Sequence, residues 1–281
     1  MKSFSFQKTI IQSCIYFVAY VVTFLLLQHL TVALINLFGH NAIATFNQIE
    51  NISSNADDWQ RNQVTYGLST GPLLLTIFSF FLLAVTREFF KGASVLKYVL
   101  VWLTVISFNF FLVGLTTNFA GKISYYWGLY QGFAVVFAWW DVSFVIMFAI
   151  AVFSILLSIL FGFLMHYEFL IFSTSIRKLK SYKERIKVLS INFLLPSFLG
   201  TIIILSLCNS YSYSLHIGVF INLCFIFLGL ILRFNSDITY LRMRFNLLEN
   251  GNSSYKNIFN FPIYFPVAFA VIIWLFVFFL Q

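Results

Sequence analysis

The sequence predicts an all-α, polytopic helical membrane protein with about seven transmembrane helices, an N-terminus inside the cell and a C-terminus outside. Hydrophobic residues make up 60% of the 281 residues and charged residues only 9%, whereas a soluble protein of this size needs a more polar surface. Fifteen of the 17 Lys and Arg residues lie in alternate polar segments, starting from the N-terminus. Because cytoplasmic loops are enriched in Lys and Arg, this alternation predicts the topology.

Each predicted span is an apolar block close to the length of roughly 20 residues that a helix needs to cross a bilayer. Together they form a single transmembrane domain over residues 1–281. The spans comprise about residues 10–38, 68–86, 96–119, 142–165, 188–207, 215–232 and 261–280. The first block is too long for the apolar core of a signal peptide, so we expect it to remain as a span.

Two predicted outer segments, 39–67 and 120–141, could re-enter the membrane. The second is rich in aromatic residues that favour the headgroup level of a bilayer. These aromatic residues are Tyr125, Tyr126, Trp127, Tyr130, Trp139 and Trp140. We interpret the segment as an interfacial aromatic belt, or alternatively as a wall of an outward-facing pocket.

Uncharged polar residues enter the spans at several positions, among them Gln12 and Gln28. The candidates for interhelical hydrogen bonds or for a polar cavity are His29, Asn36, Asn109 and Asn222. His29 and Asn36 are seven residues apart and therefore share one face of a helix. Such side chains usually bond neighbouring helices, and the alternative is a polar cavity between the first and third spans.

Charged residues lie at or beyond the ends of the predicted spans, which argues against a proton-coupled transporter or a voltage sensor. Glu168 is expected to pair with a nearby Lys, and His166 to act as a cap. The longest basic run is expected to mark the inner face and to attract anionic lipid. It comprises Arg177, Lys178, Lys180, Lys183, Arg185 and Lys187.

The segment Asn36–His40, Asn-Leu-Phe-Gly-His, resembles the His-Glu-Leu-Gly-His form of the HExxH zinc motif, with only Gly39 and His40 retained. Gly71-Pro72 and the segment Asn192–Gly200 resemble parts of the site-2-type (M50) intramembrane metalloproteases. The chain also looks like uncharacterised bacterial multi-pass proteins related to that family. This resemblance implies the fold but not the activity, because a zinc site needs about three protein ligands and only His40 matches.

The leading functional hypothesis is a non-catalytic subunit or scaffold within a membrane protein complex. The alternatives are a degenerate M50-like protease that uses His40 as a metal ligand, and a transporter or channel for a small neutral solute. No catalytic residue and no cofactor is predicted. The expected partners are the lipid bilayer and other integral membrane proteins, and the net charge of +8 is assigned to the inner face of the membrane rather than to nucleic acid. A bacterial inner (cytoplasmic) membrane is the expected location.

Overall fold

The computed structural model describes residues 2–46, 49–51, 59–90, 92–123, 132–173, 177–208, 212–234 and 262–279. Within these ranges, six helical segments are long and apolar enough to cross a membrane. They are α1 (Lys2–Leu37), α2 (Arg61–Phe89), α3 (Val95–Thr116), α6 (Phe144–Leu170), the continuous run from α7 (Tyr182–Leu189) to α8 (Leu195–Leu205), and α9 (Tyr213–Leu232). The described part of the chain thus has the make-up of a multi-pass membrane protein.

Shorter elements join these helices. Strand β1 (Ala42–Ala44) pairs antiparallel with β2 (Ile49–Asn51), with Ala42 opposite Asn51. The remaining short elements are α4 (Asn118–Ile123), α5 (Phe133–Trp139), the 3₁₀ turn η2 (Arg177–Lys180) and α11 (Tyr264–Phe279). Helix α11 corresponds to the predicted seventh span, but its 16 residues fall below the roughly 20 that cross a bilayer unaided. A count of seven spans therefore remains a prediction.

Several helices extend past the predicted spans, and in α2 and α6 the additional polar turns are hydrogen-bonded. Helix α2 starts before residue 68, and the side-chain oxygen of Gln63 accepts the backbone N–H of Gln60 at 2.9 Å. Helix α6 continues past residue 165 through His166, whose Nδ1 lies 2.6 Å from the carbonyl oxygen of Leu230. His166 thus contacts a carbonyl group in the last turn of α9, where the carbonyl groups lack helical N–H donors.

The run from α7 to α8 stays continuous through a π-helical turn, Ser190–Leu194 (η3). The N–H of Leu195 bonds back to the carbonyl of Ser190 across this turn. Pro196 has no N–H, so the carbonyl of Asn192 loses its usual donor. The hydroxyl of Tyr98 on α3 donates to that carbonyl at 2.7 Å, which explains how a proline is accommodated within the helix.

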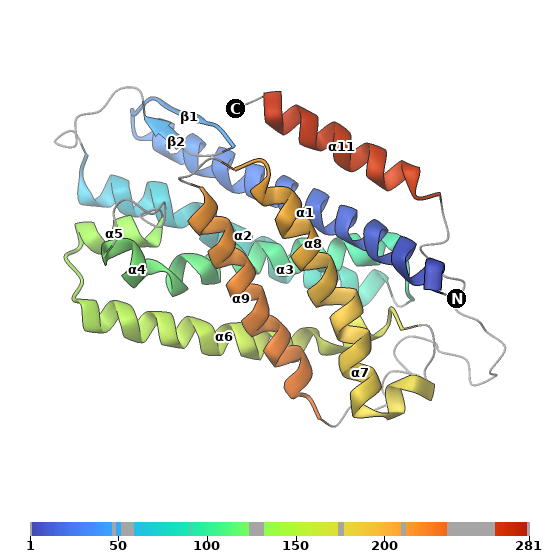
Figure 1. Cartoon of the computed structure of the whole chain (residues 1–281). Coiled ribbons are helices and arrows are strands. Elements are labelled where there is room, and N and C mark those ends of the chain that lie inside the picture. The colour runs from blue at the N-terminus through green and yellow to red at the C-terminus, as the bar shows by residue number, and fades with distance from the viewer. Residues whose placement is uncertain are drawn as a thin grey trace.

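Small residues bring α6 and α9 into close contact. A Cβ atom added at Gly162 would lie 1.9 Å from the carbonyl oxygen of Ile226, and one at Gly229 would lie 1.9 Å from that of Ile159. Only glycine permits this approach, which is typical of helix pairs in membranes. Helix α3 packs against both α6 and α9, and α11 lies beside α1 (Figure 1).

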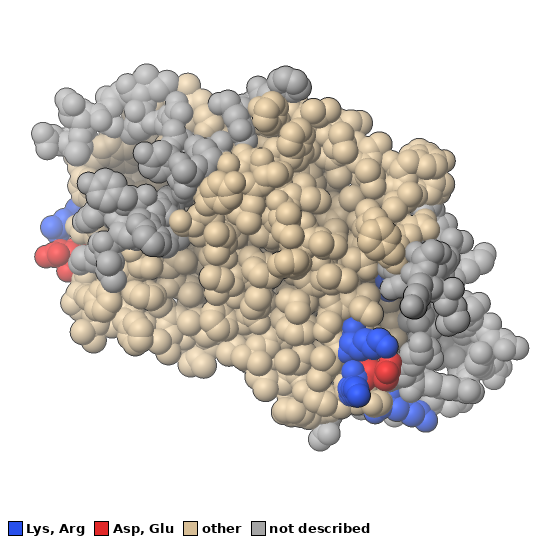
Figure 2. Space-filling view, in the orientation of Figure 1, with Lys and Arg blue, Asp and Glu red and all other residues tan. Residues whose placement is uncertain are grey.

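Aromatic rings fill the core between α1, α3, α6 and η3. The fully buried Trp102 lies with its ring centroid 4.9 Å from that of Tyr16, 5.4 Å from Phe169 and 5.0 Å from Phe193. Figure 2 shows charged side chains at two ends of the molecule, with a broad uncharged region between them. We call these ends the cavity end, where α1 finishes and α2 starts, and the Glu168 end, where α2 and α6 finish.

Candidate functional site

A cavity of about 520 Å³ lies at the cavity end, between α1, α2, α3 and α5. Its lining is mostly aliphatic and aromatic, and none of the described residues that form it is charged. The lining includes Gln28, Thr31, Leu68, Pro72, Phe133 and Trp59. The volume falls within the range of roughly 300–1,000 Å³ that is usual for small-molecule sites.

Glycines fix the walls of this cavity. A Cβ atom at Gly71 would lie 2.8 Å from Oγ1 of Thr31, so α1 and α2 approach closely only because that atom is missing. A Cβ atom at Gly114 would lie 2.9 Å from the ring of Phe133. Because glycine lacks this atom, α5 can pack closely against α3. The short helix α5 therefore forms one wall of the cavity.

The most informative lining residue is Gln28 on α1. Its residue exposure is 5%, and none of the described residues forms a hydrogen bond with its side-chain amide. A carboxamide offers both N–H donors and a carbonyl acceptor, and its burial without partners costs about 1–3 kcal/mol. The position of this amide in the cavity wall leaves its donors and acceptor available to a bound molecule.

Two further residues of the cavity lining carry hydrogen-bond acceptors. The hydroxyl of Thr31 donates to the carbonyl of Leu27 at 2.9 Å and keeps its lone pairs for another donor. Pro72 has no N–H, so the carbonyl of Leu68 lacks its usual helical donor. Both Leu68 and Pro72 line the cavity. The cavity is therefore apolar with a few polar groups, the arrangement that orients a neutral ligand.

One aromatic residue of the cavity lining, Trp59, is held by a stacked ring. Trp59 lines the cavity and stacks on His40, with ring centroids 3.8 Å apart and an interplanar angle of 1°. The Nε2 atom of His40 lies 3.2 Å from Oε1 of Gln63. His40 follows the end of α1 after Gly39, whose φ of 86° is left-handed, so it does not share a helix face with Asn36.

The predicted pair His29 and Asn36 does not line the cavity, since the face of α1 that carries both side chains is exposed. Asn36 instead bonds both backbone groups of Ala42, accepting from its N–H at 2.7 Å and donating to its carbonyl at 3.3 Å. This arrangement attaches β1 to the end of α1. His29 and Asn36 therefore do not have the predicted interhelical or cavity role. The side chain on α1 that faces inward at this level is the neighbouring Gln28.

Asn109 and Asn222 lie together between α3, α6 and α9, outside the cavity lining. The amide of Asn222 donates to Oδ1 of Asn109 at 2.6 Å, and the amide of Asn109 donates to the carbonyl of Val219 at 3.0 Å. Ser158 on α6 donates to Oδ1 of Asn222 at 3.0 Å. All three side chains are buried, so this network joins the three helices.

The predicted basic run splits into different environments. Arg185 is buried, with 5% exposure, and its guanidinium donates to the carbonyls of Leu179 and Phe234, so it is not available to lipid as predicted. Lys180, Lys183 and Lys187 are exposed. Arg177 and Lys178 begin η2, but their side chains lie outside the described part, as do residues Tyr125, Tyr126, Trp127 and Tyr130.

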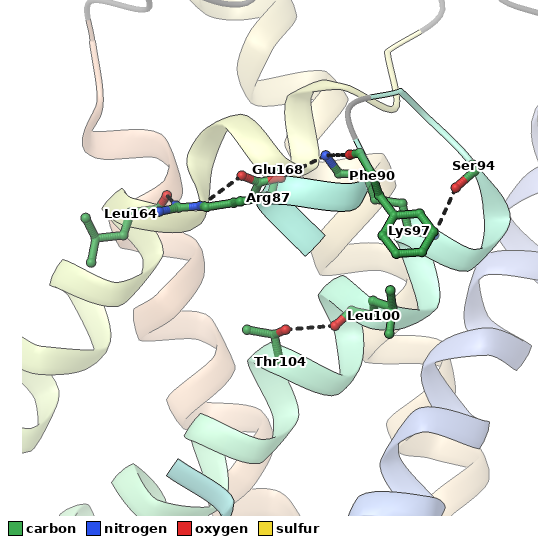
Figure 3. Close-up of polar contacts among 8 residues, drawn as sticks. All are labelled: Arg87, Phe90, Ser94, Lys97, Leu100, Thr104, Leu164 and Glu168. Atoms are coloured by element: carbon green, nitrogen blue, oxygen red, sulfur yellow. Dashed lines mark hydrogen bonds and ion pairs between the residues drawn. The ribbon is translucent and has the colours of Figure 1, made fainter. Parts of the chain in front are cut away.

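A buried ion cluster at the Glu168 end confirms the expected pairing of Glu168 with a lysine. Oε2 of Glu168 lies 3.1 Å from Nζ of Lys97, and Oε1 lies 3.2 Å from Nε of Arg87. Figure 3 shows Glu168 of α6 between Arg87 of α2 and Lys97 of α3. Lys97 also donates to the carbonyl of Phe90 at 2.8 Å. The cluster therefore joins three helices where α2 and α6 end and α3 begins.

Within the described ranges, no three His, Cys, Asp or Glu side chains gather as a metal site, around His40 or elsewhere. No protein-family model, curated protein or solved structure matches the chain.

Proposed function

We propose that this protein is an integral membrane protein that binds a small, neutral and largely apolar molecule in the cavity between α1, α2, α3 and α5. The observation that carries the proposal is the buried amide of Gln28, which lines the cavity without a hydrogen-bonding partner among the described residues. A buried polar group normally has a partner, and a ligand in the cavity would supply it.

The lining defines the class of ligand. An uncharged wall disfavours an ionic ligand, because a charge buried without a counter-charge loses its hydration. The apolar part of the lining favours a hydrocarbon or ring system, and the Gln28 amide favours a hydroxyl, carbonyl or amide group on the same molecule. Under the predicted topology, the cavity faces the outer half of the bilayer. This proposal develops the small-solute alternative, with Gln28 as the residue that contacts the solute.

The test is the small-molecule content of protein purified in mild detergent, measured by liquid chromatography and mass spectrometry after denaturation. We expect wild-type protein to retain a neutral amphiphile. Gln28→Leu should lower its occupancy by about tenfold, as expected for a lost hydrogen bond in a buried site. Leu68→Trp should exclude it by filling the cavity.

Matched controls separate loss of the ligand from general damage. His29→Leu changes the neighbouring exposed residue of α1, and Leu156→Trp adds the same bulk to an exposed position of α6. Asn109→Leu changes the buried network and should leave the ligand bound. If Leu68→Trp retains as much ligand as Leu156→Trp, the cavity is not the binding site.

The sequence-based alternatives remain proposals and can be tested on the same preparation. Native mass spectrometry would reveal a partner subunit as additional mass, as the scaffold hypothesis predicts. It would reveal zinc if the M50-like hypothesis holds. Fractionation of cells would test the predicted location in a bacterial cytoplasmic membrane.

A further inference from the structure

Arg233 lies at the Glu168 end without an acidic partner among the described residues. It follows the last residue of α9, and its guanidinium carbon lies 4.2 Å from the ring centroid of Tyr167 and 4.8 Å from that of Phe163. Both rings belong to the last turns of α6. Cation–π contacts position a guanidinium without neutralising it, so its N–H donors remain available to an anion.

Arg87 lies against the same turns of α6. Its Nη2 atom donates to the carbonyl of Leu164 at 3.1 Å, while its Nε atom pairs with Glu168. Glu168 also pairs with Lys97, so a single carboxylate forms ion pairs with two basic residues. Arg87 and Arg233 therefore place two guanidinium groups against the last turns of α6, and Glu168 is the one carboxylate that the ion pairs among the described residues bring to this place.

An apolar stripe on α6 leads away from these charges. Its exposed residues include Leu156, Leu160 and Phe163, at 58%, 54% and 38% exposure. Their spacing places them on one face of the helix. Hydrocarbon chains could follow this face while a phosphate remains near the guanidinium groups.

We propose that the end of α6 binds the headgroup of an anionic phospholipid, with Arg233 as the main phosphate contact and Arg87 beside it. The guanidinium groups suit the headgroup, because basic residues at helix ends attract anionic lipid. The apolar stripe on α6 suits the acyl chains, because exposed aliphatic side chains contact hydrocarbon. Arginine suits phosphate particularly well because its planar N–H groups can donate in pairs. This site is separate from the predicted basic run, in which the guanidinium of Arg185 already donates to backbone carbonyl groups.

The experiment is a native mass spectrometry titration of the full chain in neutral detergent. Phosphatidylglycerol and phosphatidylcholine with the same acyl chains are added separately, and the bound fraction is compared. We expect the wild-type protein to retain phosphatidylglycerol preferentially. Arg233→Gln should reduce that preference by about fivefold, the effect of removing one basic residue near a headgroup.

Arg61→Gln is the matched control, because it removes one positive charge from an exposed arginine that also contacts an aromatic ring, Trp140, but lies at the cavity end. It should leave the preference unchanged. Equal losses in the two variants would show diffuse attraction and overturn the site, as would equal binding of both lipids by the wild type. If Arg233→Gln does not fold, Arg233→Ala and the wild-type comparison test the same contact.

Discussion

The hydroxyl of Tyr98 on α3 donates to the backbone carbonyl of Asn192, the carbonyl that Pro196 leaves without a helical donor, at 2.7 Å. The side chain of the same Asn192 accepts the amide of Gln12 on α1 at 2.8 Å. The π-helical turn between α7 and α8 is thereby joined to two neighbouring helices. In an apolar environment a carbonyl without a donor is costly, so these contacts stabilise the irregular turn.

Tyr98→Phe is expected to lower the free energy of unfolding by about 1–3 kcal/mol, because it leaves the buried carbonyl of Asn192 without its donor. Unfolding by SDS titration, followed by circular dichroism, measures the change. The control is Tyr66→Phe, which removes a hydroxyl from a residue that is 58% exposed. In a Pro196→Ala background the restored N–H should reduce the effect of Tyr98→Phe. An equal effect in both backgrounds would show that the hydroxyl does not compensate for the proline.

Glu168→Gln is expected to destabilise the protein by about 3–5 kcal/mol, because it removes the carboxylate charge that pairs with the fully buried Lys97. The same SDS titration measures the loss, and Glu184→Gln on α7 is the control for removal of a partly exposed acid. Combining Glu168→Gln with Lys97→Met should cost less than the sum of the single changes, since the charge that needs a partner is then absent. Additive losses would contradict the pairing.

Gly162→Ala is expected to lower the unfolding free energy by about 1–3 kcal/mol, the usual effect of overpacking a close contact. The added Cβ would lie 1.9 Å from the carbonyl oxygen of Ile226, so α6 and α9 must separate. Gly92→Ala is the matched control, because a Cβ at that position meets nothing within 4 Å. Thermal unfolding in detergent compares the two variants. Equal melting temperatures for both would mean that α6 and α9 do not depend on this contact.

The candidate site was only partly predictable because α1 is apolar on all sides. In a bilayer, side chains that face lipid and side chains that face other helices are both apolar, so periodicity does not show which face is buried. The sequence therefore did not distinguish Gln28, which lines the cavity, from His29, which is exposed. The aromatic composition of segment 120–141 favours a pocket wall as one of two alternatives, and α5 within it lines the cavity through Phe133 and Trp139.

By itself, the sequence determined that this chain is helical and has the make-up of a multi-pass membrane protein. Blocks of apolar residues of spanning length need internal backbone hydrogen bonding in lipid, and the helix provides it. Only the tertiary structure decided which polar side chains meet. The contact of Lys97 with Glu168, the bond from Tyr98 to Asn192 and the cavity at Gln28 each join residues far apart in the chain. Such contacts depend on how the helices rotate and pack, and close packing at glycines fixes that rotation.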